Sequence, residues 1–264
     1  MQPITPRSIT TRTLCTLSAG TVALGLFAAS AAVNAESFDG YKVYSPSVTK
    51  GETEIEAREF YLSDDDNAVD ETHSGRFAIA HAFTSYWATE LYGVYESEPG
   101  EDTEYEAEWE NRFQLTPTGK YWLDLGALVE IERGELSESD QPYSVQYGLL
   151  FEKQIQDWVA TLNLSLENEV GSNASDDTNF LYRGRVRYRL NEYFQPDVEF
   201  YSAPGPVSDL RTSSEQQTQV GPGFSGETSL GSGSSLSYST ALLFGANSSS
   251  PDVTPVVRLE YEFF

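Results

Sequence analysis

Residues 103–133 contain two runs in which apolar and polar side chains alternate, separated by a Thr-Pro-Thr-Gly sequence typical of a tight turn. Side chains of a strand point to opposite faces with period two, so each run predicts a strand with one apolar and one charged face. The charged faces carry Glu104, Glu106, Glu108, Glu110 and Arg112, then Glu130 and Glu132. Both runs exceed the usual length of a soluble strand and have aromatic residues near their ends. Strands of about 9–11 residues with aromatic girdles are typical of transmembrane β-barrels.

Residues 1–35 have the organisation of a secretory signal peptide. Arg7 and Arg12 precede an apolar segment, and the small-residue sequence Val-Asn-Ala at 33–35 predicts cleavage there. An uncleaved anchor fits less well, because Thr, Ser and Gly interrupt the apolar segment. Lipid attachment at Cys15 also fits less well, because polar residues and Arg12 precede it. Cys15 is the only cysteine, so the expected mature domain, residues 36–264, has no disulfide and no thiol site.

The chain carries a net charge of −25, and loss of Arg7 and Arg12 would make the remainder still more negative. This charge argues against nucleic acid and anionic membrane surfaces as partners. The acidic residues gather in expected loops at 63–71, 96–102, 135–140 and 176–177. These loops are either solvated surface or sites that recruit divalent cations bridging to lipopolysaccharide.

The region after residue 35 contains about twelve strand-like runs and no apolar segment of about 18 residues, the length that a membrane-spanning helix needs. A closed barrel is the strand-based way to satisfy every backbone group in lipid. Connections alternate between short and long, as periplasmic turns and external loops do. We therefore expect a transmembrane, antiparallel, up-and-down β-barrel in a bacterial outer membrane. The expected strands are residues 51–62, 76–83, 87–96, 104–115, 121–133, 143–151, 158–169, 180–190, 194–200, 216–224, 236–245 and 256–264.

The end of the chain is an alternating apolar run that includes Tyr261 and Phe263 and stops at Phe264. It resembles the terminal strand of outer-membrane barrels, which ends in an aromatic residue and serves as an assembly signal. Phe264 is one residue beyond the usual spacing. The resemblance implies the outer-membrane assembly machinery as a partner and leaves open which phenylalanine that machinery reads.

The polar faces of the expected strands would line the lumen. The acidic row at 104–110 and its neighbours Glu130 and Glu132 would form one wall, and a basic row would lie four strands away. That row consists of Arg183, Arg185, Arg187 and Arg189. Two interpretations follow: a polar, open or gated channel whose transverse field orients charged or dipolar solutes, or a lumen plugged by Glu–Arg pairs. Eight strands leave a filled interior and sixteen a water channel, so about twelve strands fit either.

Enzymatic interpretations have less support. The two histidines are His73, in an expected acidic loop, and His81, on the apolar face of an expected strand. Neither belongs to a nucleophile motif, so an outer-membrane hydrolase is a minor alternative to a pore or to a closed structural or surface-binding barrel. The sequence predicts no cofactor and no metal site, since Asp64–Asp66 would hold Ca²⁺ only weakly.

Four short segments carry a more specific resemblance. Residues 47–56, 87–90, 113–116 and 259–263 resemble a group of poorly characterised proteobacterial outer-membrane proteins, often described as transporters akin to the phenol meta-pathway family. The resemblance implies an outer-membrane location and a barrel architecture. It implies no catalytic residue and no particular solute.

Overall fold

A computed structural model describes residues 40–64, 70–134, 136 and 141–264. The expected signal peptide, residues 1–35, lies outside the described residues. Residues 65–69, 135 and 137–140, which belong to two of the expected acidic loops, lie outside them as well. Within the described part of the chain, no helix is long and apolar enough to cross a membrane.

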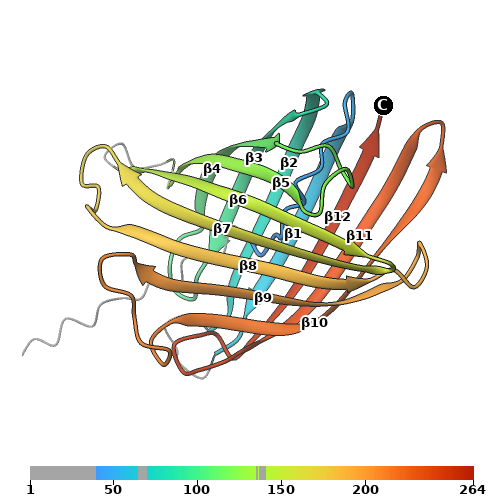
Figure 1. The fold of residues 1–264 in the computed structure, drawn as a ribbon. Helices are drawn as coiled ribbons and strands as arrows, with labels where there is room; N and C mark the ends of the chain where they lie inside the picture. Colours follow the sequence, from blue (N-terminus) through green and yellow to red (C-terminus); the bar gives the residue numbers. More distant parts are fainter. Residues whose placement is uncertain (1–39, 65–69, 135, 137–140) are drawn as a thin grey trace, which may run out of the picture. The chain divides into compact units, whose positions relative to one another are not determined.

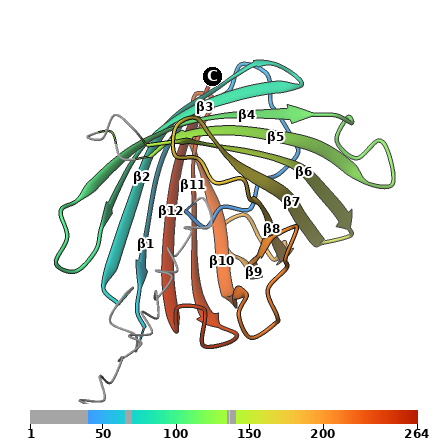
Figure 2. The same cartoon turned by 90° about the vertical axis from the view of Figure 1, so that its left-hand side faces the viewer.

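Residues from Thr53 to Phe263 form a closed barrel of twelve strands (Figures 1 and 2). Every strand is antiparallel to its neighbours in sequence, and β1 closes the barrel by pairing with β12. The strands are β1 (Thr53–Leu62), β2 (Thr72–Thr84), β3 (Trp87–Ser97), β4 (Glu104–Gln114), β5 (Asp124–Arg133), β6 (Tyr143–Ile155), β7 (Trp158–Val170), β8 (Thr178–Tyr188), β9 (Gln195–Pro206), β10 (Gln217–Gly231), β11 (Ser234–Gly245) and β12 (Val253–Phe263). The predicted fold class and strand number are confirmed.

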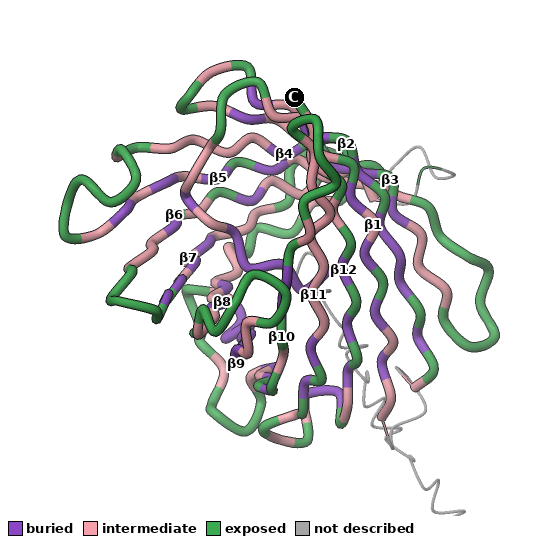
Figure 3. Tube along the Cα trace, turned by 90° about the vertical axis from the view of Figure 1, so that its right-hand side faces the viewer, coloured by how far each residue is buried: buried purple, intermediate pink, exposed green. Residues whose placement is uncertain are grey.

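Exposure along the strands is inverted relative to a soluble protein. On β3, Leu91 is 57% exposed whereas the adjacent Glu90 is 2% exposed, and on β1 Ile55 and Glu56 differ in the same sense. Buried and exposed positions alternate along most strands (Figure 3). An apolar outer face and a buried polar inner face suit a barrel whose outside meets lipid.

Several strand ends differ from the prediction by three residues or more. β2 begins at Thr72 instead of residue 76 and β12 at Val253 instead of residue 256, whereas β6 extends to Ile155 and β9 to Pro206, beyond the expected ends at residues 151 and 200.

Two further ends differ, those of the fifth and tenth strands. The fifth strand begins at Asp124 rather than at residue 121, because residues 115–123 form an extended connection in which Lys120 N bonds to Pro117 O. The tenth strand continues to Gly231 instead of ending at residue 224. A glycine within it obscured this continuation: a Cβ atom on Gly226 would lie only 2.3 Å from Tyr193 O, so only glycine fits there.

The barrel has two distinct ends. Residues 85–86, 156–157 and 232–233 make two-residue turns at the end that also contains Phe264. We name this the turn end and the opposite one the loop end. The connection at 115–123 is a long exception among the turns.

Candidate functional site in the lumen

Residues 40–50, named here the inner segment, pass through the barrel interior before β1 begins (Figure 2). Tyr41 and Tyr44 are each only 2% exposed. Tyr44 exchanges two hydrogen bonds with the side chain of Asn163 on β7, at 2.8 and 2.9 Å. Val48 N donates to Gln114 Oε1 on β4 at 2.8 Å. The inner segment is therefore bound to strands on different sides of the wall.

Arginine side chains satisfy three consecutive carbonyl groups of the inner segment. Arg58 Nη1 donates to Gly40 O at 3.3 Å, and Arg258 Nε donates to Tyr41 O at 2.8 Å. Arg183 Nη1 donates to the oxygen of the next residue, Lys42, at 3.4 Å. A buried irregular backbone needs such partners because unsatisfied carbonyl groups are costly away from water.

Lys42 places a positive charge among carboxylates of the wall. Its Nζ atom lies 2.5 Å from Glu56 Oε2, 3.3 Å from Glu90 Oε2 and 3.0 Å from the hydroxyl of Tyr92. Both glutamates are at most 2% exposed. Burying these charges is tolerable because each has a close counter-charge.

A basic row that the sequence analysis did not identify crosses β2, β1 and β12. Arg58 is the cross-strand partner of Arg76 on one side and of Arg258 on the other. Each guanidinium bonds to a different buried carboxylate. The pairs are Arg58 with Glu56, Arg76 with Glu108, and Arg258 with Glu199.

Towards the loop end, the interior becomes an apolar core. The ring of Tyr41 packs edge-to-face on Phe60 and Tyr201, with centroids 4.9 and 5.1 Å apart. Leu243 and Val256 of the same cluster are fully buried. The alternation predicted a polar inner face throughout, whereas this part of the inner face is apolar. Side chains of the inner segment fill this part and leave apolar residues in contact with one another rather than with water.

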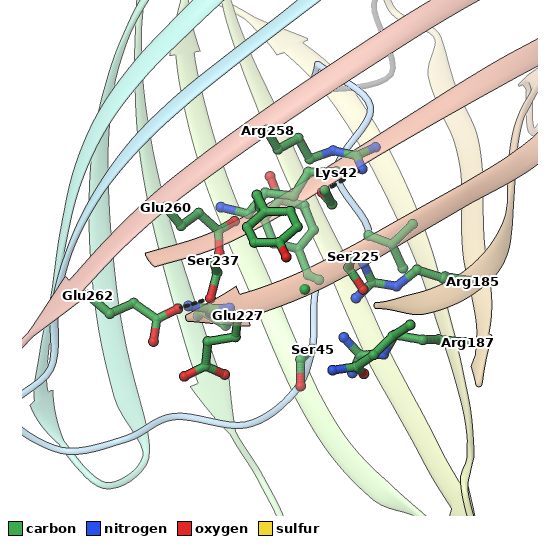
Figure 4. A pocket seen from close by; sticks show the side chains of 17 residues that line it. Lys42, Ser45, Arg185, Arg187, Ser225, Glu227, Ser237, Arg258, Glu260 and Glu262 are labelled. Carbon is green, nitrogen blue, oxygen red and sulfur yellow. Dashed lines mark hydrogen bonds between the residues drawn. The ribbon is translucent and has the colours of Figure 1, made fainter. Parts of the chain in front are cut away.

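Towards the turn end, a cavity of about 260 Å³ remains between the inner segment and the wall (Figure 4). Figure 4 shows Glu260 and Glu262 on one side of it and Arg185 and Arg187 on the other. The residues that line it include Arg112, Arg185, Arg187, Ser225, Glu227, Glu260 and Glu262.

The acidic residues expected in the lumen occupy a range of environments. Glu108, Glu110 and Glu130 are buried, Glu106, Glu132 and Arg112 are half-buried, and Glu104 is exposed at the start of β4. One carboxylate oxygen from each of Glu106, Glu108 and Glu132 lies within 4.8 Å of the others, a grouping of a kind that can hold a cation. The hydrogen bond from Arg76 to Glu108 already supplies positive charge there.

The expected basic row lies on β8 and just beyond it. Arg183 is buried and donates to Gln146 Oε1 at 2.6 Å, whereas Arg185 and Arg187 are half-buried and face the cavity. Arg189 is exposed after the end of β8. The structure thus brings two residues of this row together with Arg112 of the predicted acidic wall.

The terminal aromatic residues lie at the turn end. Tyr261 and Phe263 stack with ring centroids 5.4 Å apart, both within β12. Phe264 follows the strand and is 71% exposed.

The two histidines make local contacts near the ends of the barrel. His81 Nδ1 lies 2.9 Å from Thr53 Oγ1, and His73 packs against the ring of Tyr61. His73 was expected in an acidic loop but lies in β2, where it is the cross-strand partner of Tyr61, and His81 is the partner of Thr53.

The described acidic loop residues show ordinary surface chemistry. Partial burial raises the pKa of Glu98, and repulsion from Glu101 adds to the shift. Hydrogen bonds from Thr212 lower the pKa of Glu215. The Asp64 main chain bonds to Asp70 at 3.0 Å, while Asp65 and Asp66 lie outside the described residues.

The sequence analysis missed the inner segment and the residues that bind it. The sequence carries one sign of this segment: Tyr41, Lys42 and Tyr44 form a basic aromatic stretch just before the first alternating run. Arg58 and Arg258 were also visible on the polar faces of their strands. What periodicity could not supply was the pairing between residues 217 positions apart, as in Arg258 and Tyr41.

Comparisons with known proteins bear on the fold. No family model and no curated protein sequence matches the chain. The NanC porin structure superposes with a TM-score of 0.54 at 10% identity, covering 80% of this chain and 99% of that chain. The β domain of the Bordetella autotransporter BrkA gives 0.52 at 13% identity, covering 81% and 99%. The translocator domain of the autotransporter NalP from Neisseria meningitidis gives 0.50 at 9% identity, covering 82% and 89%.

These similarities agree with the closed sheet, the lipid-suited outer face and the polar inner face. The chain is a twelve-stranded, multi-pass β-barrel of the bacterial outer membrane with a porin-like fold.

Proposed function

We propose that this barrel is a gated pore for small charged solutes, kept closed by the inner segment. The observation that carries the proposal is the charged cavity beside that segment, lined by Arg185 and Arg187 on one side and by Glu260 and Glu262 on the other. A purely structural barrel gains nothing from half-buried charges that line a cavity without pairing across it, because desolvating charge is costly.

The way the inner segment is held supports a gate. Its main chain bonds to the wall through side chains, as in the Arg258–Tyr41 and Asn163–Tyr44 contacts. Such bonds can exchange with water or solute without breaking any strand pairing. Movement of residues 40–50 would therefore widen the lumen while the sheet stays closed.

The lumen rows identified from the sequence enter this proposal as the walls of the pathway. Arg185, Arg187 and Arg112 would set its basic side, and the acidic residues of β4 and β5 its acidic side. The resemblance to transporters akin to the phenol meta-pathway family fits the same role, and the NanC neighbour is itself named a porin. Lipopolysaccharide around the barrel and the assembly machinery complete the proposed partners.

A closed structural or surface-binding barrel is the second candidate. The apolar core at the loop end favours it, since Leu243 and Val256 are fully inaccessible and Tyr41 packs between Phe60 and Tyr201. In this alternative, residues 40–50 are a permanent part of the core.

A reversible disulfide distinguishes the two candidates. Ser47 Oγ lies 3.1 Å from Thr118 Oγ1, so Ser47→Cys with Thr118→Cys would tether the inner segment to the connection between β4 and β5. Cys15, in the expected signal peptide, is the only natural cysteine. In planar bilayers, we expect brief channel openings from the reduced protein and none from the oxidised protein. Each single-cysteine variant is a control, and its channel openings should be the same under reducing and oxidising conditions.

Two results would count against the gated pore. Openings that persist unchanged after oxidation would show that the inner segment is not the gate. Silence of the reduced protein, joined by silence of a Lys42→Met variant that loosens the segment, would favour the closed barrel.

A further inference from the structure

The charges around the cavity are divided into two groups that do not neutralise each other. Of the cationic residues lining it, Lys42 pairs with Glu56, and Arg258 pairs with Glu199. Arg112 lies near Glu54 and Glu110. The remaining cations are Arg185 and Arg187, and the carboxylates opposite are Glu227, Glu260 and Glu262. Within the described part of the chain, neither of these two arginines lies within 4.0 Å of any of these three carboxylates.

The basic side has hydrogen-bonding capacity to spare. Among the described residues, the Nε atom of Arg187 is buried without a hydrogen-bond partner. The closest carboxylate to Arg185 is that of Glu199, at 3.9 Å, and that carboxylate already binds Arg258 at 2.8 Å. Guanidinium groups with vacant donors are suited to a carboxylate or similar anion.

A buried hydroxyl adds a second, uncharged contact point. Ser225 on β10 lines the cavity, is only 8% exposed, and its Oγ atom has no hydrogen-bond partner within the described residues. Buried hydroxyl groups are almost always bonded in folded proteins. An unsatisfied one facing a cavity indicates that something polar completes it.

We propose that this cavity binds a small zwitterion, with its anionic group on Arg185 and Arg187 and its ammonium group on Glu227, Glu260 and Glu262. A simple anion would meet three carboxylates on the opposite side, and a simple cation would meet two arginines. A molecule carrying both charges satisfies both sides at once. The volume of about 260 Å³ suits a molecule of amino-acid size rather than a larger ligand.

This inference rests on the proposed function for its biological setting, but binding can be measured without any current. Three probes share one carbon chain and differ only in charge: 4-aminobutyrate, butyrate and butylammonium. We expect saturation-transfer NMR on the detergent-solubilised full barrel to show saturable binding of 4-aminobutyrate, at least about fivefold tighter than of either other probe.

Two charge-removing variants test the orientation of the ligand. Arg187→Gln should weaken 4-aminobutyrate about tenfold and abolish its advantage over butylammonium, because a charge-assisted hydrogen bond is lost. Glu260→Gln should weaken it similarly and abolish its advantage over butyrate. Lys120→Gln and Glu192→Gln change exposed charges outside the cavity and should leave binding unaltered.

Heat-modifiable migration on electrophoresis checks that each variant folds, and Arg185→Gln and Glu262→Gln replace any variant that does not. The proposal is overturned if butyrate or butylammonium binds as well as 4-aminobutyrate, if no probe binds saturably, or if the cavity variants behave like the controls. Channel openings without selective binding would remove this inference and leave the pore. Selective binding by a barrel that never conducts would support this inference and remove the pore.

Discussion

Gly126 on β5 and Pro46 of the inner segment lie so close that a Cβ atom on Gly126 would be 2.8 Å from the Cβ atom of Pro46. The absence of a side chain at residue 126 therefore makes room for the segment. Glycine in a strand interior often marks such a close approach of another backbone.

Gly126→Val should push the inner segment away from β5 and raise the open probability of the pore. Overpacking of this kind costs about 1–3 kcal/mol of stability, less than a folded barrel normally requires to unfold. Single-channel recording provides the measurement. Gly93→Val is the matched control, because a Cβ atom on Gly93 meets nothing within 4 Å. Equal open probabilities in the two variants would contradict the role assigned to Gly126.

Lys42→Met should lower the free energy of unfolding by about 3–5 kcal/mol, because it leaves Glu90 buried beside a neutral side chain, while Glu56 keeps its ion pair with Arg58. Adding Glu90→Gln should recover part of the loss by removing the uncompensated charge. Urea titration of the barrel in lipid vesicles gives both values. Lys50→Met, at an exposed position, should cost little, and a similar loss there would refute the explanation.

Leu91→Arg should destabilise the barrel by about 2–4 kcal/mol in lipid, since Leu91 lies midway along β3 on the outer face and is 57% exposed. The same titration measures the cost. Leu136→Arg, also on an exposed leucine but in the connection between β5 and β6, should be nearly neutral. A small effect at Leu91 would mean that this face does not meet hydrocarbon.

Phe263→Ala should reduce the amount of folded barrel in the outer membrane more than Phe264→Ala. Phe263 belongs to β12 and stacks on Tyr261, whereas Phe264 follows the strand. The heat-modifiable fraction in isolated outer membranes reports assembly, and refolding from urea into vesicles controls for intrinsic stability. The opposite ranking would identify Phe264 as the residue read by the assembly machinery.

Alternation predicted the barrel because it is a local property. The period of two places Glu108 and Glu110 inside and Trp109 outside whatever the partner strands are, and β3 to β4 pairing in the structure keeps that arrangement. Strand continuity was harder to predict where glycine replaces the alternating side chains, as in β10. There the reason for glycine at residue 226 is the approach of Tyr193 O, which depends on tertiary structure.

The site was less predictable because its contacts join residues distant in sequence. The arginine row on β8 was found, yet which arginines are compensated depends on partners elsewhere: Arg258 binds Glu199, whereas Arg187 forms no ion pair within the described residues. The inner segment has no periodicity of its own. Its path depends on Arg58, Arg183 and Arg258 finding carbonyl groups inside a closed wall.

The bond between Arg258 and Tyr41 has a consequence for the order of folding. β12, the last strand to be synthesised, both seals the sheet against β1 and supplies the side chain that binds Tyr41. Residues 40–50 can reach their final positions only when the final strand is present, so the earliest part of the barrel domain should be among the last to become ordered. A pause before β12 docks would leave an incomplete sheet whose interior is still accessible from the side.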